Sequence, residues 1–382
     1  MDHIITGWIV AFFISFYSIP VIIQIAADKK LYDLPDERKV HKNPISSLGG
    51  IGIFAGLLVS CLLNISFSAN PEFQYYILSF LIIFFLGVKD DIVVISAHKK
   101  FIGQIFAAVI LIFKAKLIIG DMQGFLGFGV LNESFAWLLT AFTILVTINA
   151  FNLIDGVDGL AGTVASVTFI TLGILFAINQ DWSYAILAFC ASGAVASFLI
   201  YNYQPARIFM GDTGSLLIGT VASILVIHFI AAAPTYGKYP VPHSAALGFA
   251  VILVPLLDTL RVFALRIFKR RSPFSPDRNH FHHFLLDRGL NHRTVTLTIA
   301  FCSVGFIGLE LLLAPYDSTL TICTLILLFF ALIYVLYITR HAIGMKVVGA
   351  DGNIKTELPK AAVKLVNIFD SKSKTSSLEQ SN

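Results

Sequence analysis

The chain has few charged residues. Asp, Glu, Lys and Arg make up only 13% of its 382 residues, whereas 57% are hydrophobic and the mean hydropathy is +0.81. Ordinary soluble domains carry about 25% charged residues, so the composition excludes that class and favours a membrane protein. The alternating pattern of a transmembrane β-barrel is also absent. Helices are therefore the expected spans, because a helix satisfies its own backbone polar groups in lipid.

Cysteine is scarce, and no cleavable leader is expected. The four cysteines lie inside apolar runs without a Cys-x-x-Cys pair, which predicts small packed side chains rather than a metal or redox site. Only Met1, Asp2 and His3 precede the first apolar run. Because this start has no basic stretch and no small-residue cleavage site, we expect the run to be retained as a span.

Eleven apolar runs approach the roughly 20 residues that cross a bilayer. They cover residues 4–25, 48–68, 75–89, 101–119, 133–151, 159–178, 183–203, 213–233, 245–267, 294–314 and 318–340. We therefore predict an all-α, polytopic integral membrane protein with eleven transmembrane helices. Residues 1–340 would form this membrane domain, and the polar residues 341–382 a cytoplasmic tail with a disordered end.

The connections between these runs alternate in charge. Lys and Arg gather in one set of connections, whereas the other set holds only Lys238. The basic set covers residues 26–47, 90–100, 152–158, 204–212 and 268–293. The positive-inside rule then predicts that this set is cytoplasmic, with the N-terminus outside and the C-terminus inside. Lys114 and Lys116 depart from the pattern, but their long stems can reach the membrane interface.

Polar residues form five patches, all on the predicted cytoplasmic side. They are the basic stretch 38–44, Asp90-Asp91, NAFNLIDGVD (149–158), GDTG (211–214) and HFHH (280–283). Carboxylates, amides, cations and histidines at one membrane face predict an active site for a water-soluble substrate and a lipid. A solvated helix end is the alternative for Asp90 and Asp91, although acids at membrane depth are rare and usually functional.

Two patches suggest a local geometry. Four polar residues recur at every third position where the fifth run ends: Asn149, Asn152, Asp155 and Asp158. Residues at that spacing share a helix face, so they would line one cavity unless Gly156 and Gly159 break the helix. Asp212 stands where the eighth run begins. Capping of that helix is the alternative to a functional role for Asp212, and both can hold because a helix N-terminus also attracts phosphate.

The side-chain types favour a hard cation and phosphate. His280, His282 and His283 superficially suggest zinc, but no cysteine lies near them, and acidic oxygens suit Mg²⁺ or Mn²⁺. Phosphate contact by these histidines and by Arg278 explains the mixture better. Because an anionic donor and an anionic acceptor repel, a divalent cation with basic side chains predicts phosphoryl transfer, and a membrane location predicts a lipid phosphate as one substrate.

Four ordered motifs resemble a known family, the polyprenyl-phosphate N-acetylhexosamine-1-phosphate transferases. They are GVKDD (87–91), NAFNLIDGVDGLAG (149–162), NYQPARIFMGDTGSLLIG (202–219) and SPDRNHFHHFLLDRG (275–289), and the similarity covers residues 4–340. RKVHKNPISSLGG (38–50) and PDRNHFHH look like the WecA/TagO-type branch, which takes a UDP-N-acetylhexosamine. Phe281 interrupts the fuller histidine triplet of the related MraY-type translocases. Val94 stands in place of their lysine, for which Lys99 or Lys100 could substitute.

The resemblance implies an activity and roles for residues. A UDP-N-acetylhexosamine, with N-acetylglucosamine (GlcNAc) as the favoured sugar, would give its sugar-1-phosphate to undecaprenyl phosphate with Mg²⁺ or Mn²⁺ and release UMP. Asp212 would bind the metal with Asp91, and Asp90 and Asp91 would activate the lipid phosphate. The other implied catalytic residues are Asp155, Asp158, His282 and His283. The implied substrate contacts are His41, Asn149, Asn152, Asn202, Phe209, Arg278 and His280, with Phe209 stacking on uracil.

The resemblance also implies a bacterial inner-membrane enzyme with its active site on the cytoplasmic face. We expect membrane lipids and no nucleic acid as further partners, and a homodimer is left open. An ion-coupled transporter is the alternative function. Transport sites lie near the bilayer midplane on broken helices, whereas these acids cluster at span ends, and no internal repeat is evident. The aspartate-rich motifs of intramembrane prenyltransferases and CDP-alcohol phosphotransferases are absent.

Overall fold

The computed structural model describes residues 2–31, 45–272, 279–339, 346–348 and 354–356. Helices dominate this part of the chain. They are α1 (Asp2–Lys29), α2 (Gly49–Asn64), α3 (Phe73–Ile92), α4 (Ala97–Val109), α5 (Glu133–Ile154), α6 (Leu160–Ile178), α7 (Trp182–Asn202), α8 (Gly211–Ala232), α9 (Ser244–Phe268), α10 (Phe281–Leu286), α11 (His292–Leu313) and α12 (Ser318–Ile338).

Three short helices and two strands complete these elements. η1 (Ile110–Lys114) is a π-helix that continues α4, and η2 (Phe125–Gly127) and η3 (Ala233–Thr235) are single 3₁₀ turns. β1 (Lys346–Val348) pairs antiparallel with β2 (Ile354–Thr356). The hairpin falls within the segment that the sequence assigns to the tail.

Each of the eleven predicted runs coincides with a helix. Among the described residues, eight helices are long and apolar enough to cross a membrane: α1, α5, α6, α7, α8, α9, α11 and α12. α2 has only 16 residues, α4 has 13 before the π-helix, and the last turn of α3 carries charge. The helical membrane architecture is therefore confirmed, whereas the count of eleven crossings and the orientation of the termini stay predictions.

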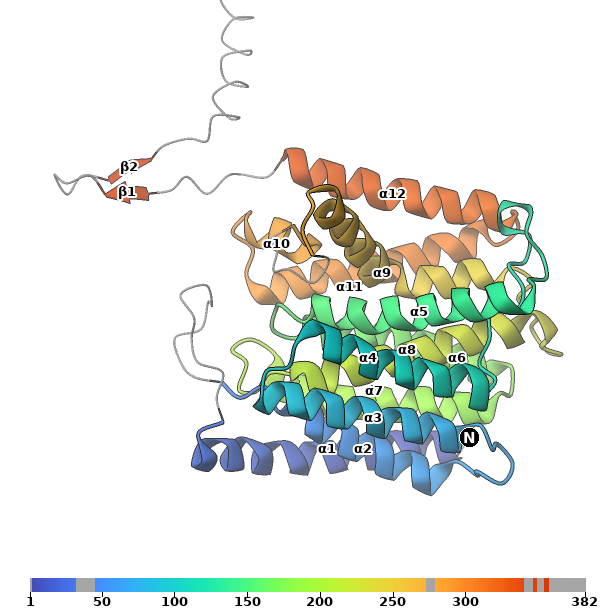
Figure 1. The fold of residues 1–382 in the computed structure, drawn as a ribbon, viewed down its shortest axis with the longest axis horizontal. Helices are drawn as coiled ribbons and strands as arrows, with labels where there is room; N and C mark the ends of the chain where they lie inside the picture. The colour runs from blue at the N-terminus through green and yellow to red at the C-terminus, as the bar shows by residue number, and fades with distance from the viewer. Residues whose placement is uncertain (1, 32–44, 273–278, 340–345, 349–353, 357–382) are drawn as a thin grey trace, which may run out of the picture.

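The long helices lie side by side in one bundle (Figure 1). The N-terminus lies at one end, and α10 and the β1–β2 hairpin lie at the other, which we call the α10 end. The loops that follow α3, α5, α7 and α9 also reach the α10 end. These are four of the connections that the charge pattern places in the cytoplasm.

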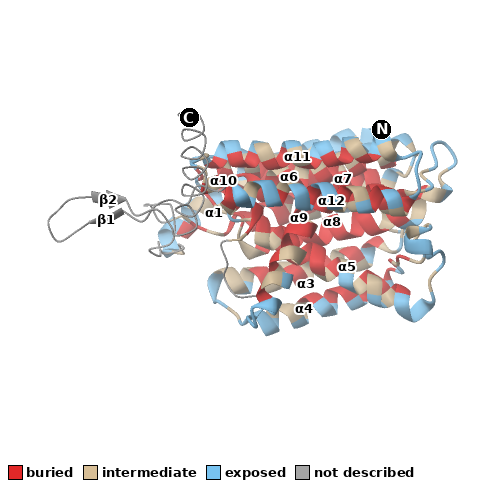
Figure 2. Cartoon of the chain, turned by 90° about the horizontal axis from the view of Figure 1, so that it is seen from above, coloured by how far each residue is buried: buried red, intermediate tan, exposed pale blue. Residues whose placement is uncertain are grey.

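α8 is the central helix of the bundle. It packs against α2, α3, α5, α6, α7 and α9. It is the most buried of the eight candidate spans, whereas α1 and α12 are the least buried (Figure 2). A helix that is apolar on all sides is stable only when neighbours or lipid surround it, and here neighbours do. The N-terminus of α8 is consequently held within the bundle at the α10 end.

Candidate active site

The N-terminus of α8 is held by a carboxylate from another helix. The first amides of a helix have no partner within it. Here Asp91, in the last turn of α3, accepts the amide of Asp212 on Oδ1 at 2.8 Å and the amide of Thr213 on Oδ2 at 2.9 Å. The Thr213 hydroxyl donates to the same Oδ2 at 2.5 Å. The alternative in which Asp212 caps α8 is therefore wrong: Met210 occupies the N-cap position, and Asp91 accepts the first amides.

Glycines allow this close approach. A Cβ at Gly211, which has φ +66°, would lie 1.9 Å from the Ser47 carbonyl oxygen and 2.7 Å from Asp91 Oδ2. A Cβ at Gly50 of α2 would lie 2.1 Å from the Gly214 amide nitrogen. No larger residue fits at either position without backbone movement. Gly50 and Gly211 thus allow α2, α3 and the start of α8 to lie close together.

Lys100 joins two of the predicted acids. It lies in the first turns of α4, and its Nζ contacts Asp90 Oδ2 at 2.5 Å and also pairs with Asp212 Oδ2. Lys99 beside it is exposed. Of the two lysines that the sequence left open as substitutes at Val94, Lys100 is therefore the one that reaches the acids.

Asn152 completes the environment of Asp212. Its Nδ2 donates to Asp212 Oδ1 at 2.6 Å and to Ser215 Oγ at 2.9 Å. One turn earlier in α5, Asn149 Nδ2 donates to Gln104 Oε1 at 2.8 Å. Asn149 therefore ties α5 to α4 inside the bundle, whereas Asn152 reaches the acids.

The helix that carries Asn149 and Asn152 ends before it reaches Asp155 and Asp158. α5 ends at Ile154 and α6 begins at Leu160, and Gly159 between them has φ +76°. Asp155 is the C-cap of α5 and half-buried. Burial raises the pKa of Asp155 to about 7, and the nearby charges of Asp212, Asp91 and Asp158 act in the same direction. Asp155 therefore holds a proton more readily than an exposed carboxyl does.

Asp158 points toward α11. It is buried, and its Oδ1 lies 3.3 Å from His292 Nδ1. Its Oδ2 accepts the amide of Ala206 at 3.4 Å, and its carbonyl accepts the Thr296 hydroxyl at 3.0 Å. Asp158 thus ties the turn between α5 and α6 to α11 and to the loop after α7. The sequence did not identify His292.

The two predicted uridine contacts lie in and after α7. Asn202 is buried: its Oδ1 accepts the Gly159 amide at 2.8 Å, and its Nδ2 donates to the Ile208 carbonyl at 2.8 Å. Phe209 is half-buried, and its amide donates to the Ser46 carbonyl at 2.8 Å. Asn202 therefore shapes the loop that carries Phe209, and direct contact of either residue with uridine stays a prediction.

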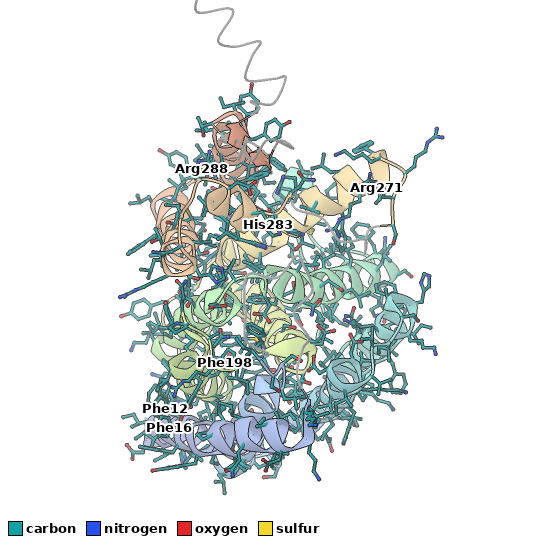
Figure 3. The ribbon with its side chains drawn as sticks, turned by 90° about the vertical axis from the view of Figure 1, so that its left-hand side faces the viewer. Phe12, Phe16, Phe198, Arg271, His283 and Arg288 are labelled. Carbon is teal, nitrogen blue, oxygen red and sulfur yellow. The ribbon has the colours of Figure 1, made fainter. Side chains whose placement is uncertain are left out.

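The histidines lie on and before α10, beside the turn between α5 and α6 that holds Asp155 and Asp158, which we call the acidic turn. A Cβ at Gly156 would lie 2.9 Å from His282 Nε2, so this ring faces the Asp155–Asp158 turn. Burial lowers the pKa of His282 to about 3, and His283 and His280 act in the same direction, so His282 is neutral at physiological pH. In Figure 3, which looks onto the α10 end, His283 lies toward the middle and Arg271 at the outer edge.

α9 contributes charged residues that the sequence interpretation missed. Asp258 and Arg266 are buried in α9, and Arg261 Nη2 donates to Asp258 Oδ1 at 2.7 Å. Both Asp258 and Arg266 contact His280. Charges inside a membrane span are uncommon, and that signal could have identified them. His41 and Arg278 lie outside the described residues.

The acids fit a magnesium ion that is bound partly by protein carboxylates and partly by substrate phosphate. Among the described residues, no group of three or more His, Cys, Asp or Glu side chains is placed to hold a metal by itself. Asp90 and Asp212 nevertheless converge on one cation, Lys100. Mg²⁺ commonly takes one or two carboxylates and completes its shell with water and substrate phosphate. Asp91 has both oxygens engaged at α8, so its role as a metal ligand stays a prediction.

Known proteins are similar in sequence to this chain. The family described as glycosyl transferase family 4 matches residues 73–230, which include all the site acids except Asp258. An undecaprenyl-phosphate alpha-N-acetylglucosaminyl 1-phosphate transferase of Salmonella typhi is 31% identical over 294 residues, or 75% of this chain and 77% of the relative. Its Escherichia coli (strain K12) namesake is 30% identical over 80% of this chain and 82% of the relative. A probable undecaprenyl-phosphate N-acetylglucosaminyl 1-phosphate transferase of Bacillus subtilis (strain 168) is 30% identical over 80% and 84%, respectively.

Proposed function

The chain belongs to glycosyl transferase family 4, and we propose that it transfers GlcNAc-1-phosphate from UDP-GlcNAc to undecaprenyl phosphate. An oxygen of the lipid phosphate attacks the phosphorus that carries the sugar. The bond from that phosphorus to UMP breaks, and UMP leaves with the bridging oxygen. The products are undecaprenyl-diphospho-GlcNAc and UMP.

One observation carries this proposal: the acids Asp90 and Asp212, from different helices, converge on one cation, Lys100, at the α10 end. A lysine ammonium attracts phosphate oxygens, and carboxylates hold a hard cation. Both kinds of group are needed when a phosphate attacks a diphosphate. No observation favours the ion-coupled transporter.

Asp155 is the residue best suited to hold the proton of the attacking phosphate. A general base works best when its pKa is close to the working pH, and burial raises the pKa of Asp155 to about 7. Asp90 is less suited, because its Oδ2 is paired with Lys100 and its Oδ1 accepts the Ile95 amide at 2.7 Å. Asp90 therefore remains an ionised partner for cations, while the Asp155 carboxylate takes up the proton.

Mg²⁺ would be held by Asp212 and Asp90 and would supply positive charge to the diphosphate. Lys100 then contacts a phosphate oxygen directly. His282, which is neutral, donates a hydrogen bond rather than a charge. The acids and the histidines lie at the α10 end, where the basic connections also lie. This charge pattern supports the proposal that the reaction takes place at the cytoplasmic face of a bacterial inner membrane.

The experiment is a transfer assay with purified protein, radiolabelled UDP-GlcNAc, undecaprenyl phosphate and Mg²⁺. We expect a labelled lipid and one UMP for each lipid formed, loss of turnover in excess EDTA, and recovery with Mg²⁺. UDP-GalNAc in place of UDP-GlcNAc tests the sugar. Absence of labelled lipid with every UDP-N-acetylhexosamine would contradict the proposal.

Two adjacent lysines provide a matched pair of variants. Lys100→Ala leaves Asp90 and Asp212 without their shared cation and is expected to lower turnover by at least about 100-fold, the scale of losing one stabilising donor. Lys99→Ala removes the same charge from an exposed position and should stay within about twofold of wild type. Equal losses in both variants would mean that Lys100 acts only through the general charge of the loop.

A further inference from the structure

Both ring nitrogens of His280 are engaged by groups from α9. His280 Nδ1 lies 2.9 Å from Asp258 Oδ2, and Arg266 Nη2 lies 3.4 Å from His280 Nε2. His280 and Asp258 are each only 4% exposed. His280 therefore has no free ring nitrogen to offer to a phosphate.

These partners determine which nitrogen carries the proton. A guanidinium group only donates hydrogen bonds, so His280 Nε2 must accept from Arg266. The proton then lies on Nδ1 and is donated to the Asp258 carboxylate. A neutral imidazole in this tautomer satisfies both contacts, whereas the opposite tautomer would place two donors against each other at Nε2.

The same carboxylate holds the backbone that follows His280. Asp258 Oδ1 accepts the Phe281 amide at 3.0 Å and Arg261 Nη2 at 2.7 Å. Arg261 Nη2 also donates to the Asn279 carbonyl. Asp258 and Arg261 thus fix the chain on both sides of His280 to α9, and with it the first turn of α10.

His282 has a different environment. Its ring is nearly parallel to that of His280, with the planes at 4° and the centroids 5.6 Å apart. His282 Nε2 faces Gly156, and Nδ1 is a buried nitrogen without a hydrogen-bond partner among the described residues. Of these two rings, His282 is the one that faces the acidic turn.

We propose that Asp258 is a positioning residue: it holds His280 in the Nδ1–H tautomer and anchors α10, so that His282 is presented to the Asp155–Asp158 turn. His280 is then a support and not a substrate contact, which revises the role implied by the family resemblance. The inference rests on the proposed function, because the histidines serve the transfer reaction.

Substitutions at His280 separate support from substrate contact. The side-chain amide of Asn donates from nearly the place of imidazole Nδ1, so His280→Asn keeps the bond to Asp258. We expect His280→Asn to retain kcat within about fivefold, whereas His280→Ala and Asp258→Asn lose about 10–100-fold, as supporting residues around a site commonly do. The KM for UDP-GlcNAc should change less than about threefold in all three variants, because no substrate contact is removed.

Asp317→Asn is the matched control. Asp317 accepts amides at the start of α12 as Asp258 does at the start of α10, but at the opposite end of the bundle. This variant should keep wild-type kcat. A tenfold or larger rise in the KM for UDP-GlcNAc in His280→Asn, with kcat reduced as in His280→Ala, would overturn the proposal.

A measurement without turnover distinguishes the two proposals. ¹⁵N NMR of histidine-labelled protein, with His280 assigned by its loss in His280→Asn, should show a neutral ring protonated on Nδ1, and Asp258→Asn should remove that signature. If wild type makes no labelled lipid but the signature is present, the proposed function fails and the placement of His280 stands. If His280 is protonated on Nε2, the positioning role fails whatever the activity.

Discussion

Thr213 donates two hydrogen bonds to a single oxygen of Asp91, from its amide at 2.9 Å and from its hydroxyl at 2.5 Å. The preceding acid, Asp90, instead pairs with Lys100. The two neighbours therefore have different tasks. Asp91 anchors the helix that carries Asp212, and Asp90 faces the cations of the reaction.

Asp91→Asn and Asp212→Asn should both abolish turnover but differ in stability. Asp91→Asn places an amide against donors of Thr213, and a buried donor left without an acceptor costs about 1–3 kcal/mol. Its apparent Tm should fall by several degrees. Asp212→Asn loses an anionic ligand for Mg²⁺, and its Tm should change much less.

Turnover assays and thermal unfolding in detergent test this pair. Thr213→Val, which removes only the hydroxyl bond to Asp91, should lower the Tm by less than Asp91→Asn does. Normal activity in either Asp variant would contradict the assignment of both acids to the site. Equal Tm losses in the two would contradict their division of tasks.

The pH dependence of turnover should contain an inflection near pH 7 from Asp155. The carboxylate form accepts the proton, so kcat should rise with pH up to about 7 and then level off. Asp155→Asn should be slow at every pH and lack this inflection. A wild-type profile that is flat from pH 5.5 to 8 would exclude Asp155 as the base.

The same carboxyl also predicts how stability depends on pH. Its pKa in the folded protein is raised from 3.8 to about 7, so the folded state binds the proton more tightly than the unfolded state. Stability from this group is present at low pH and is lost as pH rises between these values. The stability advantage of Asp155→Asn over wild type should therefore grow from about pH 4 to pH 7 and stay constant above.

Phe209→Ala should selectively weaken nucleotide binding. A base stacked on an aromatic ring gains about 1–3 kcal/mol, so the KM for UDP-GlcNAc should rise by roughly tenfold. The KM for undecaprenyl phosphate should stay nearly constant. Phe128→Ala, an exposed phenylalanine in the loop after η2, is the control. Equal loss of affinity for both substrates would leave Phe209 as an anchor of its loop.

Cysteine labelling in sealed cells tests the orientation. In a background without the four native cysteines, a reagent that does not cross membranes should label Gly127→Cys and Tyr236→Cys. It should not label Ser275→Cys or His41→Cys, two positions outside the described residues. Permeabilised cells should label all four. External labelling of Ser275→Cys would place the α10 end outside the cell.

The positions of the long helices could be predicted from the sequence because membrane spans are long, apolar runs. The sequence also predicted that Asp90, Asp91, Asn152, Asp155 and Asp212 would meet, since all follow or begin spans at one face. It did not predict that Asp91 caps α8, because a shared membrane face brings residues together without specifying which oxygen accepts which amide. It also missed Asp258, although an acid inside an apolar run is itself an unusual signal. Its partner, His280, is brought to it only by the fold.

Chain order has a consequence for how this site is made. The acidic part, from Asp90 to Ser215, precedes α9 and α10 in the chain, and a ribosome makes the N-terminal part first. The carboxylates are therefore synthesised before the arginines of α9 and the histidines of α10. Lys100 belongs to the early part, so Asp90 and Asp212 have a countercharge within their own half of the protein during biosynthesis.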